Sequence, residues 1–150
     1  MKVVTTIEKD IENELLLIAP PAVSVRLPNA NCILADKLTA FAPHTSGIPY
    51  NVDKEMEIIK QLYDISALIG YIDDFSEVKS NYFDIIKTEL EYRSMTVTAE
   101  DALRDAIKTA ACIAGRGLYH AEEYALLQKG TTNIRNNIYS ENFNGEIAVQ

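Results

Sequence analysis

Two charged side chains lie among apolar residues of predicted helices, a setting in which a charged group can bind a substrate or transfer a proton. Lys37 stands at the edge of an apolar helix face that includes Leu34 and Phe41, and Asp64 lies within an apolar stretch of a second predicted helix. If these helices are neighbours, the ammonium can bind phosphate oxygens, and the carboxylate can transfer a proton or orient the lysine. The structural alternative is that the lysine stem packs while its ammonium reaches water, with Asp64 on a solvated helix side. Taken alone, the pattern favours this structural alternative.

The common catalytic signatures are absent from the sequence. It contains no GxGxxG, GxxxxGK[ST], HExxH or GxSxG pattern. His44 and His120 have no cysteine or carboxylate at a metal-ligand spacing, so no zinc site is predicted, and His44 is expected to be a solvated residue of a turn-rich loop. Cys32 and Cys112 lie far apart without a CxxC pattern, which predicts two buried, reduced thiols.

Length and composition are typical of a globular chain with one domain. The 150 residues are 47% apolar and 24% charged, enough to bury a core without disulfides or a structural metal. The longest uncharged apolar run, residues 15–23, contains two prolines and is far shorter than the roughly 20 residues of a membrane span. The first ten residues become charged too early for a signal-peptide core. We therefore expect a cytoplasmic protein with no membrane partner.

The charge balance disfavours broad binding to nucleic acid. Lys plus Arg is 14 and Asp plus Glu is 22, which gives a net charge of −8. Neutralisation of phosphates supplies most non-specific affinity for nucleic acid, so any such partner must meet a local basic surface. Residues 104–135 carry a modest excess of basic side chains, although a mixed, solvated surface explains them as well.

Strand-like and helical patterns divide the chain near residue 30. Strands are predicted at Val3–Ile7, Glu14–Ile18 and Val23–Leu27. The first predicted helix is capped by Asn31 and ends near Phe41, and two more cover residues 53–72 and 76–91. A Thr98–Asp101 capping box opens the fourth helix. The fifth is Tyr119–Lys129, which ends at Gly130, and a short sixth covers residues 132–139. Expected inward positions include Ile58, Leu62, Ile65, Ile69 and Ile72 in the second helix and Leu103, Ile107, Ala110 and Ala114 in the fourth.

These elements predict an α+β fold that is mostly α. Residues 1–30 form a short β element, residues 31–140 form a bundle of about five helices, and residues 141–150 are expected to be a frayed tail.

Two sequence blocks together resemble a known enzyme family. ILADKLTAFAPHTSGIPY, followed by KEMEIIKQLYDISALI, is similar to the central region of the AbiEii/AbiGii nucleotidyltransferase toxins. These belong to the DNA polymerase β-like nucleotidyltransferase superfamily and to bacterial abortive-infection and type IV toxin–antitoxin systems. The resemblance implies that Lys37 and Asp64 are catalytic residues whose helices pack together, with their heads within about 4 Å. It also implies that Lys60, where many relatives carry arginine, binds substrate without a bidentate guanidinium fork.

Two further family motifs have no counterpart here. No glycine precedes Lys37, and no Asp-x-Asp pair occurs there, so the Gly-Ser and Asp-x-Asp motifs that position the NTP and Mg²⁺ are missing. We therefore expect the C-terminal part of such an enzyme, inactive alone, with residues 1–30 the last strands of its sheet and Mg²⁺, NTP and an RNA acceptor bound by the complete enzyme. One alternative is a non-catalytic helical module that binds a protein partner such as an antitoxin, or self-associates through its N-terminal β segment. The other is an unrelated helical bundle.

Overall fold

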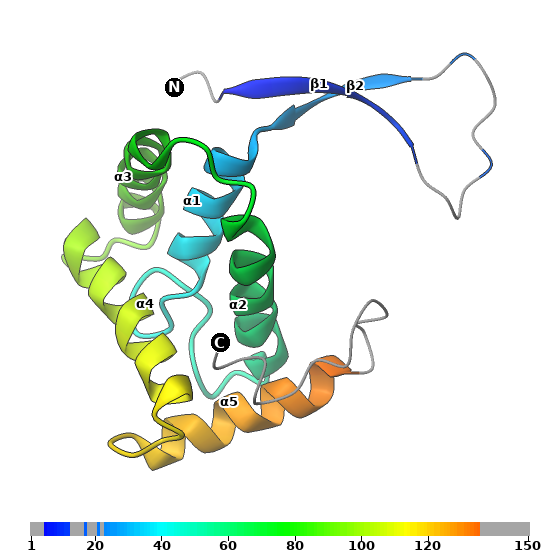
Figure 1. Ribbon diagram of the computed structural model, residues 1–150. Helices are drawn as coiled ribbons and strands as arrows, with labels where there is room; N and C mark the ends of the chain where they lie inside the picture. Colours follow the sequence, from blue (N-terminus) through cyan, green and yellow to red (C-terminus); the bar gives the residue numbers. More distant parts are fainter. Residues whose placement is uncertain (1–4, 13–16, 18–20, 22, 136–150) are drawn as a thin grey trace.

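A two-stranded hairpin precedes five helices. The computed structural model describes residues 5–12, 17, 21 and 23–135. The strands are β1 (Thr6–Asp10) and β2 (Ser24–Pro28). The helices are α1 (Ala30–Ala40), α2 (Glu55–Ile69), α3 (Phe75–Tyr92), α4 (Ala99–Ala114) and α5 (Ala121–Ile134) (Figure 1). The fold is α+β and mostly α, as the sequence predicts.

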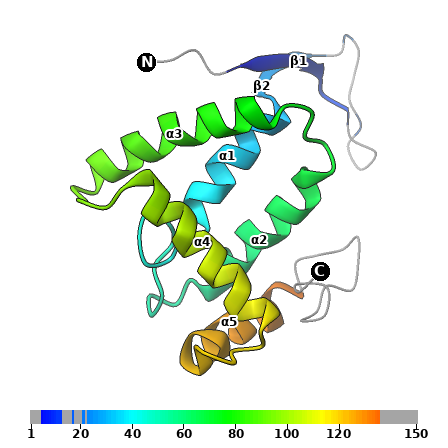
Figure 2. The ribbon, with the colours of Figure 1, turned by 60° about the vertical axis from the view of Figure 1, so that its left-hand side comes forward.

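The helices enclose a core in two adjoining parts. α1 packs mainly against α3 and α2, while α5 packs across α2 at the end of the molecule distant from the hairpin (Figure 2). One part of the core joins α2, α4 and α5 with the chain after α1, and its buried members are Phe41, Ala42, Ile58, Ile59, Ala106, Cys112, Ile113, Leu127 and Ile134. The other joins α1, α3 and α4 through Leu34, Ala35, Val78, Tyr82, Ile86, Leu90 and Ala102. Both cysteines are free and buried, as predicted.

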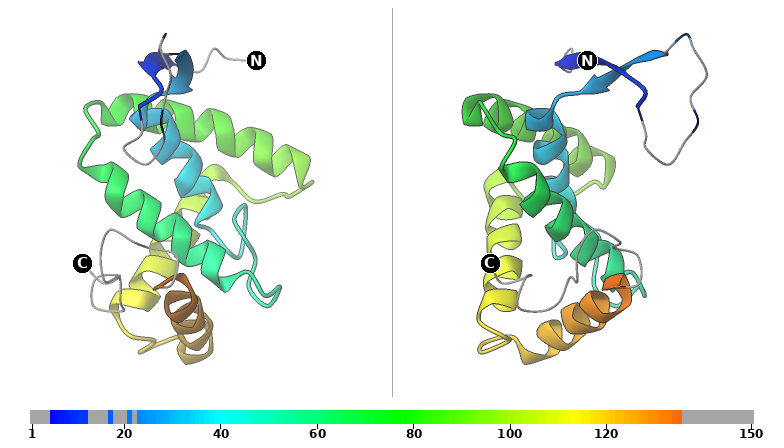
Figure 3. Two further views of the ribbon diagram at one scale, coloured as in Figure 1. Left: turned by 90° about the vertical axis from the view of Figure 1, so that its right-hand side faces the viewer. Right: turned by 45° about the vertical axis from the view of Figure 1, so that its right-hand side comes forward.

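The hairpin extends away from the helices (Figures 1 and 3). Its strands are antiparallel with Ile7 opposite Leu27, Glu8 opposite Arg26 and Asp10 opposite Ser24. β2 matches the predicted strand within one residue. β1 shares Thr6 and Ile7 with the predicted Val3–Ile7 and continues to Asp10, while Val3 and Val4 lie outside the described residues. The cross-strand pairs explain this continuation, because the chain is extended where Glu8 and Asp10 meet polar partners on β2.

The predicted capping residues are confirmed at α4, whereas at α1 a different residue caps the helix. Thr98 and Asp101 form the predicted capping box of α4. The side chain that caps α1 belongs to Asn29 and accepts a hydrogen bond from the Cys32 amide at 2.9 Å, whereas Asn31 was predicted. Asn31 is instead buried inside the first turn, where its amide donates to Asp73 at 2.8 Å. Both asparagines suit a cap, and the choice depends on these tertiary contacts.

The predicted inward face of α4 is wrong except at Ala110, which is partly buried against the core. Leu103 and Ile107 are 37% and 61% exposed, whereas the neighbouring face, with Asp105 and Thr109, is buried. The helix is turned because its polar residue Asp105 receives hydrogen bonds from the loop after α1. In α2 the prediction fails in the same way at Ile69, which is 56% exposed near the end of the helix.

The predicted end of α5 at Gly130 is also wrong, since the helix continues to Ile134. A Cβ at position 130 would lie 2.3 Å from the Glu55 carbonyl oxygen, so this glycine permits close packing of α5 on α2 and does not terminate the helix.

Some expectations fall on residues outside the described part. These are most of the strand Glu14–Ile18, of which Leu17 alone is described and is fully exposed, the end of the helix 132–139, and the tail 141–150. None of the described helices combines the length and apolar character needed to cross a bilayer.

Candidate functional site

Lys37 and Asp64 meet between two neighbouring helices. The Lys37 Nζ of α1 lies 2.9 Å from the Asp64 Oδ2 of α2, and each side chain is about one-quarter exposed, at 24% and 26%. The predicted contact of the two heads is therefore confirmed. A partly exposed pair of this kind contributes at most about 1 kcal/mol to stability. Its value is positional, because the carboxylate restrains a long flexible side chain and holds the ammonium at the solvent boundary.

Lys60 lies one helical turn before Asp64 on α2 and is exposed. Residues separated by four positions share a helix face, so Lys60 adds a second cation on the side of α2 that carries Asp64. Among the described residues, no group of three or more His, Cys, Asp or Glu side chains is arranged to hold a metal ion. A single carboxylate that already contacts an ammonium does not make a Mg²⁺ site. The chemistry available here is the binding of phosphate oxygens by ammonium groups.

A second polar constellation connects the loop after α1 to α4. Asp105 is 95% buried, and its carboxylate accepts three hydrogen bonds from this loop. The donors are the His44 backbone amide at 2.8 Å, the Thr45 hydroxyl at 2.9 Å and the His44 Nδ1 at 2.8 Å. Because the carboxylate fixes Nδ1 as the donor of the imidazole, Nε2 is directed away from α4. Sequence reasoning placed His44 in a turn as a solvated residue, and its side chain is 51% exposed, as predicted. The contact with the buried Asp105 was not predicted.

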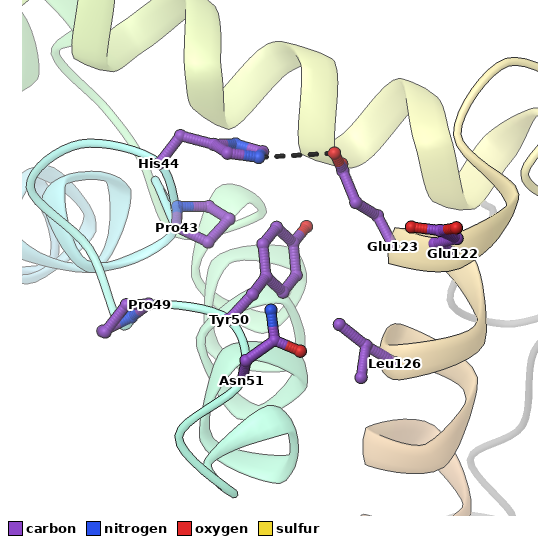
Figure 4. Close-up of a pocket in the computed structure, with 8 residues that line it drawn as sticks. All are labelled: Pro43, His44, Pro49, Tyr50, Asn51, Glu122, Glu123 and Leu126. Carbon is purple, nitrogen blue, oxygen red and sulfur yellow. Dashed lines mark ion pairs between the residues drawn. The ribbon is translucent and has the colours of Figure 1, made fainter.

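α5 supplies the other partner of His44. The His44 Nε2 lies 3.3 Å from the Glu123 Oε1, as the dashed line in Figure 4 shows. The same carboxylate oxygen lies 3.8 Å from the Nδ1 of His120, the residue that precedes α5. Tyr50 stands beside this group, with its ring edge-on to the imidazole of His44 at a centroid distance of 5.2 Å. Burial raises the pKa of Tyr50, so its phenol is neutral at physiological pH.

The sequence carried a signal for the first constellation and none for the second. Lys37 and Asp64 belong to two blocks that the family resemblance pairs. His44, Asp105 and Glu123 are widely separated and follow no spacing rule, since a loop and two helices bring them together. The single available hint was a histidine in a loop rich in proline and glycine.

Comparison with known proteins assigns no role to either group of residues. No protein-family model, curated protein or solved structure matches this chain.

Proposed function

We propose that this chain is the C-terminal helical part of an AbiEii-like nucleotidyltransferase, which in its complete form transfers a nucleotide from an NTP to an RNA acceptor. The observation that carries the proposal is the 2.9 Å contact between Lys37 and Asp64. These residues belong to separate sequence blocks, and the family resemblance requires them to meet. In an unrelated helical bundle this contact is one partly exposed salt bridge among others, whereas the family resemblance predicts it for these two residues.

Lys37 is the phosphate-binding group in this proposal. Its ammonium binds oxygens of the triphosphate, while Asp64 holds the ammonium in position, and the exposed Lys60 adds charge on the same side of α2. The described donor set does not suit Mg²⁺, so the metal belongs to the Gly-Ser and Asp-x-Asp motifs of the complete enzyme. The chain by itself therefore binds a triphosphate weakly and does not transfer a nucleotide.

The test is a titration of the ¹⁵N-labelled chain with an NTP and Mg²⁺, followed by amide chemical shifts. We expect shifts in α1 and α2 around Lys37 and Asp64 that disappear in Lys37→Met. Lys87→Met is the matched control, because Lys87 is an exposed lysine on α3, outside this site. Unchanged α1 and α2 spectra, or equal responses of the two variants, contradict the proposal.

An activity assay tests the missing motifs separately. The chain is incubated with RNA, Mg²⁺ and a labelled NTP, and we expect no incorporation of label. Robust transfer that is lost in Lys37→Ala would show that the chain is catalytic alone and would overturn its assignment as part of a larger enzyme.

A second candidate function is a non-catalytic interaction module, favoured by the apolar face of the hairpin. The cross-strand pairs place Ile7, Leu27 and Val25 on one face, where Lys9 is the one charged residue, while Glu8 and Arg26 share the opposite face. Ile7 and Leu27 are 47% and 41% exposed. Exposed apolar strands favour association, so this candidate predicts pairing of the hairpin with a second copy.

Sedimentation at tens of micromolar tests the second candidate. A dimer is expected that dissociates in Leu27→Lys, while Thr6→Lys, on the polar face, leaves it intact. A monomeric unaltered chain contradicts self-association and directs the search to a different protein partner such as an antitoxin.

A further inference from the structure

Two cavities adjoin at His44 and Glu123, away from the Lys37–Asp64 pair. The first, of about 410 Å³, lies along α4 and includes Arg104, Lys108 and His120 in its lining. The second, of about 520 Å³, lies between the loop after α1 and α5 (Figure 4). Both cavities are lined by His44 and Glu123, whose contact forms their common boundary. The His44 side chain is half-exposed, so a ligand that crosses the solvent side of this contact can reach both cavities.

Two cations and three carboxylates line the first cavity. Two of its carboxylates are satisfied internally, since Asp105 accepts three hydrogen bonds from the loop and Asp101 accepts the capping hydrogen bonds of Thr98. Lys108 forms no ion pair with a described residue, and the only ion-pair contact of Arg104 in the same part of the chain is a 4.0 Å approach to Asp101. The two cations lie one turn apart on α4 and face the same cavity.

The imidazoles extend this donor set toward the second cavity. Glu123 contacts His44 and His120 through one carboxylate oxygen, and the Glu123 side chain is 29% exposed. The Glu123 carboxylate therefore occupies the space between the two rings, at the border of the cavities. A phosphate at the mouth of the first cavity, away from this carboxylate, meets a guanidinium and an ammonium, the groups that proteins use for phosphate.

The second cavity has a different character. Its walls include Pro43, Pro49, Leu126 and the ring of Tyr50, and its polar lining groups include the amide of Asn51 and the carboxylates of Glu122 and Glu123 (Figure 4). Flat apolar and aromatic surfaces accept the face of a nucleobase, and an amide can pair with the polar edge of the base. The volume of about 520 Å³ lies in the range of small-molecule sites.

We propose that the paired cavities bind a nucleoside phosphate unit. Arg104 and Lys108 hold its phosphate, and the base lies against Tyr50 in the adjoining cavity. The unit is either a free nucleotide or one nucleotide of an RNA strand, because both present the same base and phosphate. The proposal does not depend on the nucleotidyltransferase assignment, since it uses α4, α5 and the loop after α1.

Titration of the unaltered ¹⁵N-labelled chain tests whether the base and the phosphate of one ligand both contribute to binding. The probes are AMP, adenosine, inorganic phosphate and a short oligoadenylate. AMP is expected to shift amides of α4, α5 and the loop after α1, and to bind at least about tenfold more tightly than adenosine or phosphate. Similar affinity for AMP and phosphate contradicts the base cavity, and the absence of shifts in these elements overturns the proposal. Tighter binding of oligoadenylate than of AMP identifies RNA as the source, and the reverse identifies a free nucleotide.

Variants then assign the residues. Lys108→Met is expected to weaken AMP binding about tenfold, while the matched control Lys87→Met leaves it within about twofold. Tyr50→Leu is expected to reduce AMP binding to that of phosphate, with circular dichroism reporting whether the variant folds. If Lys37→Met abolishes AMP binding and Lys108→Met does not, the nucleotide binds between α1 and α2. That outcome overturns this inference and supports the proposed function.

Discussion

The helical body and the hairpin are stabilised by different means. Every helix of the body buries side chains in the shared core, whereas no residue of β1 or β2 is fully buried. The body therefore depends on close packing, and the hairpin depends on cross-strand pairs and on its attachment to the helices. Substitutions that change side-chain volume should therefore destabilise the helical body, and substitutions that change charge should mainly destabilise the hairpin.

The attachment of the hairpin is a small polar cluster at the start of α3. Glu77 accepts hydrogen bonds from the Asn29 amide at 3.0 and 3.1 Å and from the Asn31 amide at 2.6 Å. These bonds connect the end of β2 and the start of α1 to α3. Hydrogen bonds from Asn31, Thr5 and Asn29, in that order of importance, lower the pKa of the Glu77 carboxyl. The orientation of the hairpin therefore depends on an ionised carboxylate.

The largest effect is expected from added volume in the body. In Gly130→Ala the new Cβ would lie 2.3 Å from the Glu55 carbonyl oxygen, so α5 must move away from α2. We expect a loss of about 3 kcal/mol in the free energy of unfolding, even after the roughly 1 kcal/mol that alanine contributes in helix propensity. Chemical denaturation measures it.

Gly70→Ala is the matched control for this prediction. A Cβ at Gly70 meets no atom within 4 Å, and φ there is −72°, which alanine adopts readily. We expect no loss of stability and a gain of up to about 1 kcal/mol. Equal losses in the two variants contradict the packing argument.

The second effect concerns the polar contact between the loop after α1 and α4. Asp105→Ala leaves three donors of His44 and Thr45 without their acceptor, and we expect a loss of about 2–3 kcal/mol in the free energy of unfolding. Asp105→Asn should cost only about 1 kcal/mol, because the imidazole can change tautomer and accept from the new amide. Thermal unfolding compares the two variants. A smaller loss of stability in Asp105→Ala than in Asp105→Asn would exclude this role of Asp105.

The third prediction is a response of the hairpin to acid. Since the folded pKa of Glu77 is lower than its ordinary value of 4.5, the stabilisation by this carboxylate is complete above pH 4.5 and is lost as pH falls through the folded pKa. Amide exchange should therefore accelerate at the hairpin base in that range, before the core amides of α2. Glu77→Gln removes the titrating group and should abolish this local acid response. A hairpin that loosens identically in Glu77→Gln contradicts the assignment.

The smallest effect is expected within the hairpin itself. Arg26 and Glu8 form an exposed pair at 3.0 Å, and its removal in Arg26→Ala should cost less than about 1 kcal/mol. Salt should weaken the pair in the unaltered chain and have no such effect in the variant. Chemical shifts of β1 and β2 amides report the change. A loss comparable with that of Gly130→Ala would show that the hairpin and the body unfold as one unit.

Local rules predicted the elements well and their orientation less well. The Thr98–Asp101 capping box and the extent of α3 were predicted correctly, because both depend on residues a few positions apart. The inward face of α4 was predicted incorrectly. Leu103 and Ile107 are more apolar than Asp105, but only Asp105 can accept hydrogen bonds from the loop after α1, and it is therefore the buried residue. Hydrophobic periodicity does not register a buried carboxylate whose partners come from a distant segment.

The sequence by itself determined the helical body and the β element before it, because these follow from short-range patterns. The contact of Lys37 with Asp64 was expected only from the proposed family resemblance. The tertiary structure alone decided that Gly130 packs instead of ending a helix, and that His44 meets Asp105 and Glu123. The physical reason is the same in both cases. A close approach of two backbones, or a hydrogen bond between distant segments, depends on where the helices cross, and no local pattern of side chains encodes that position.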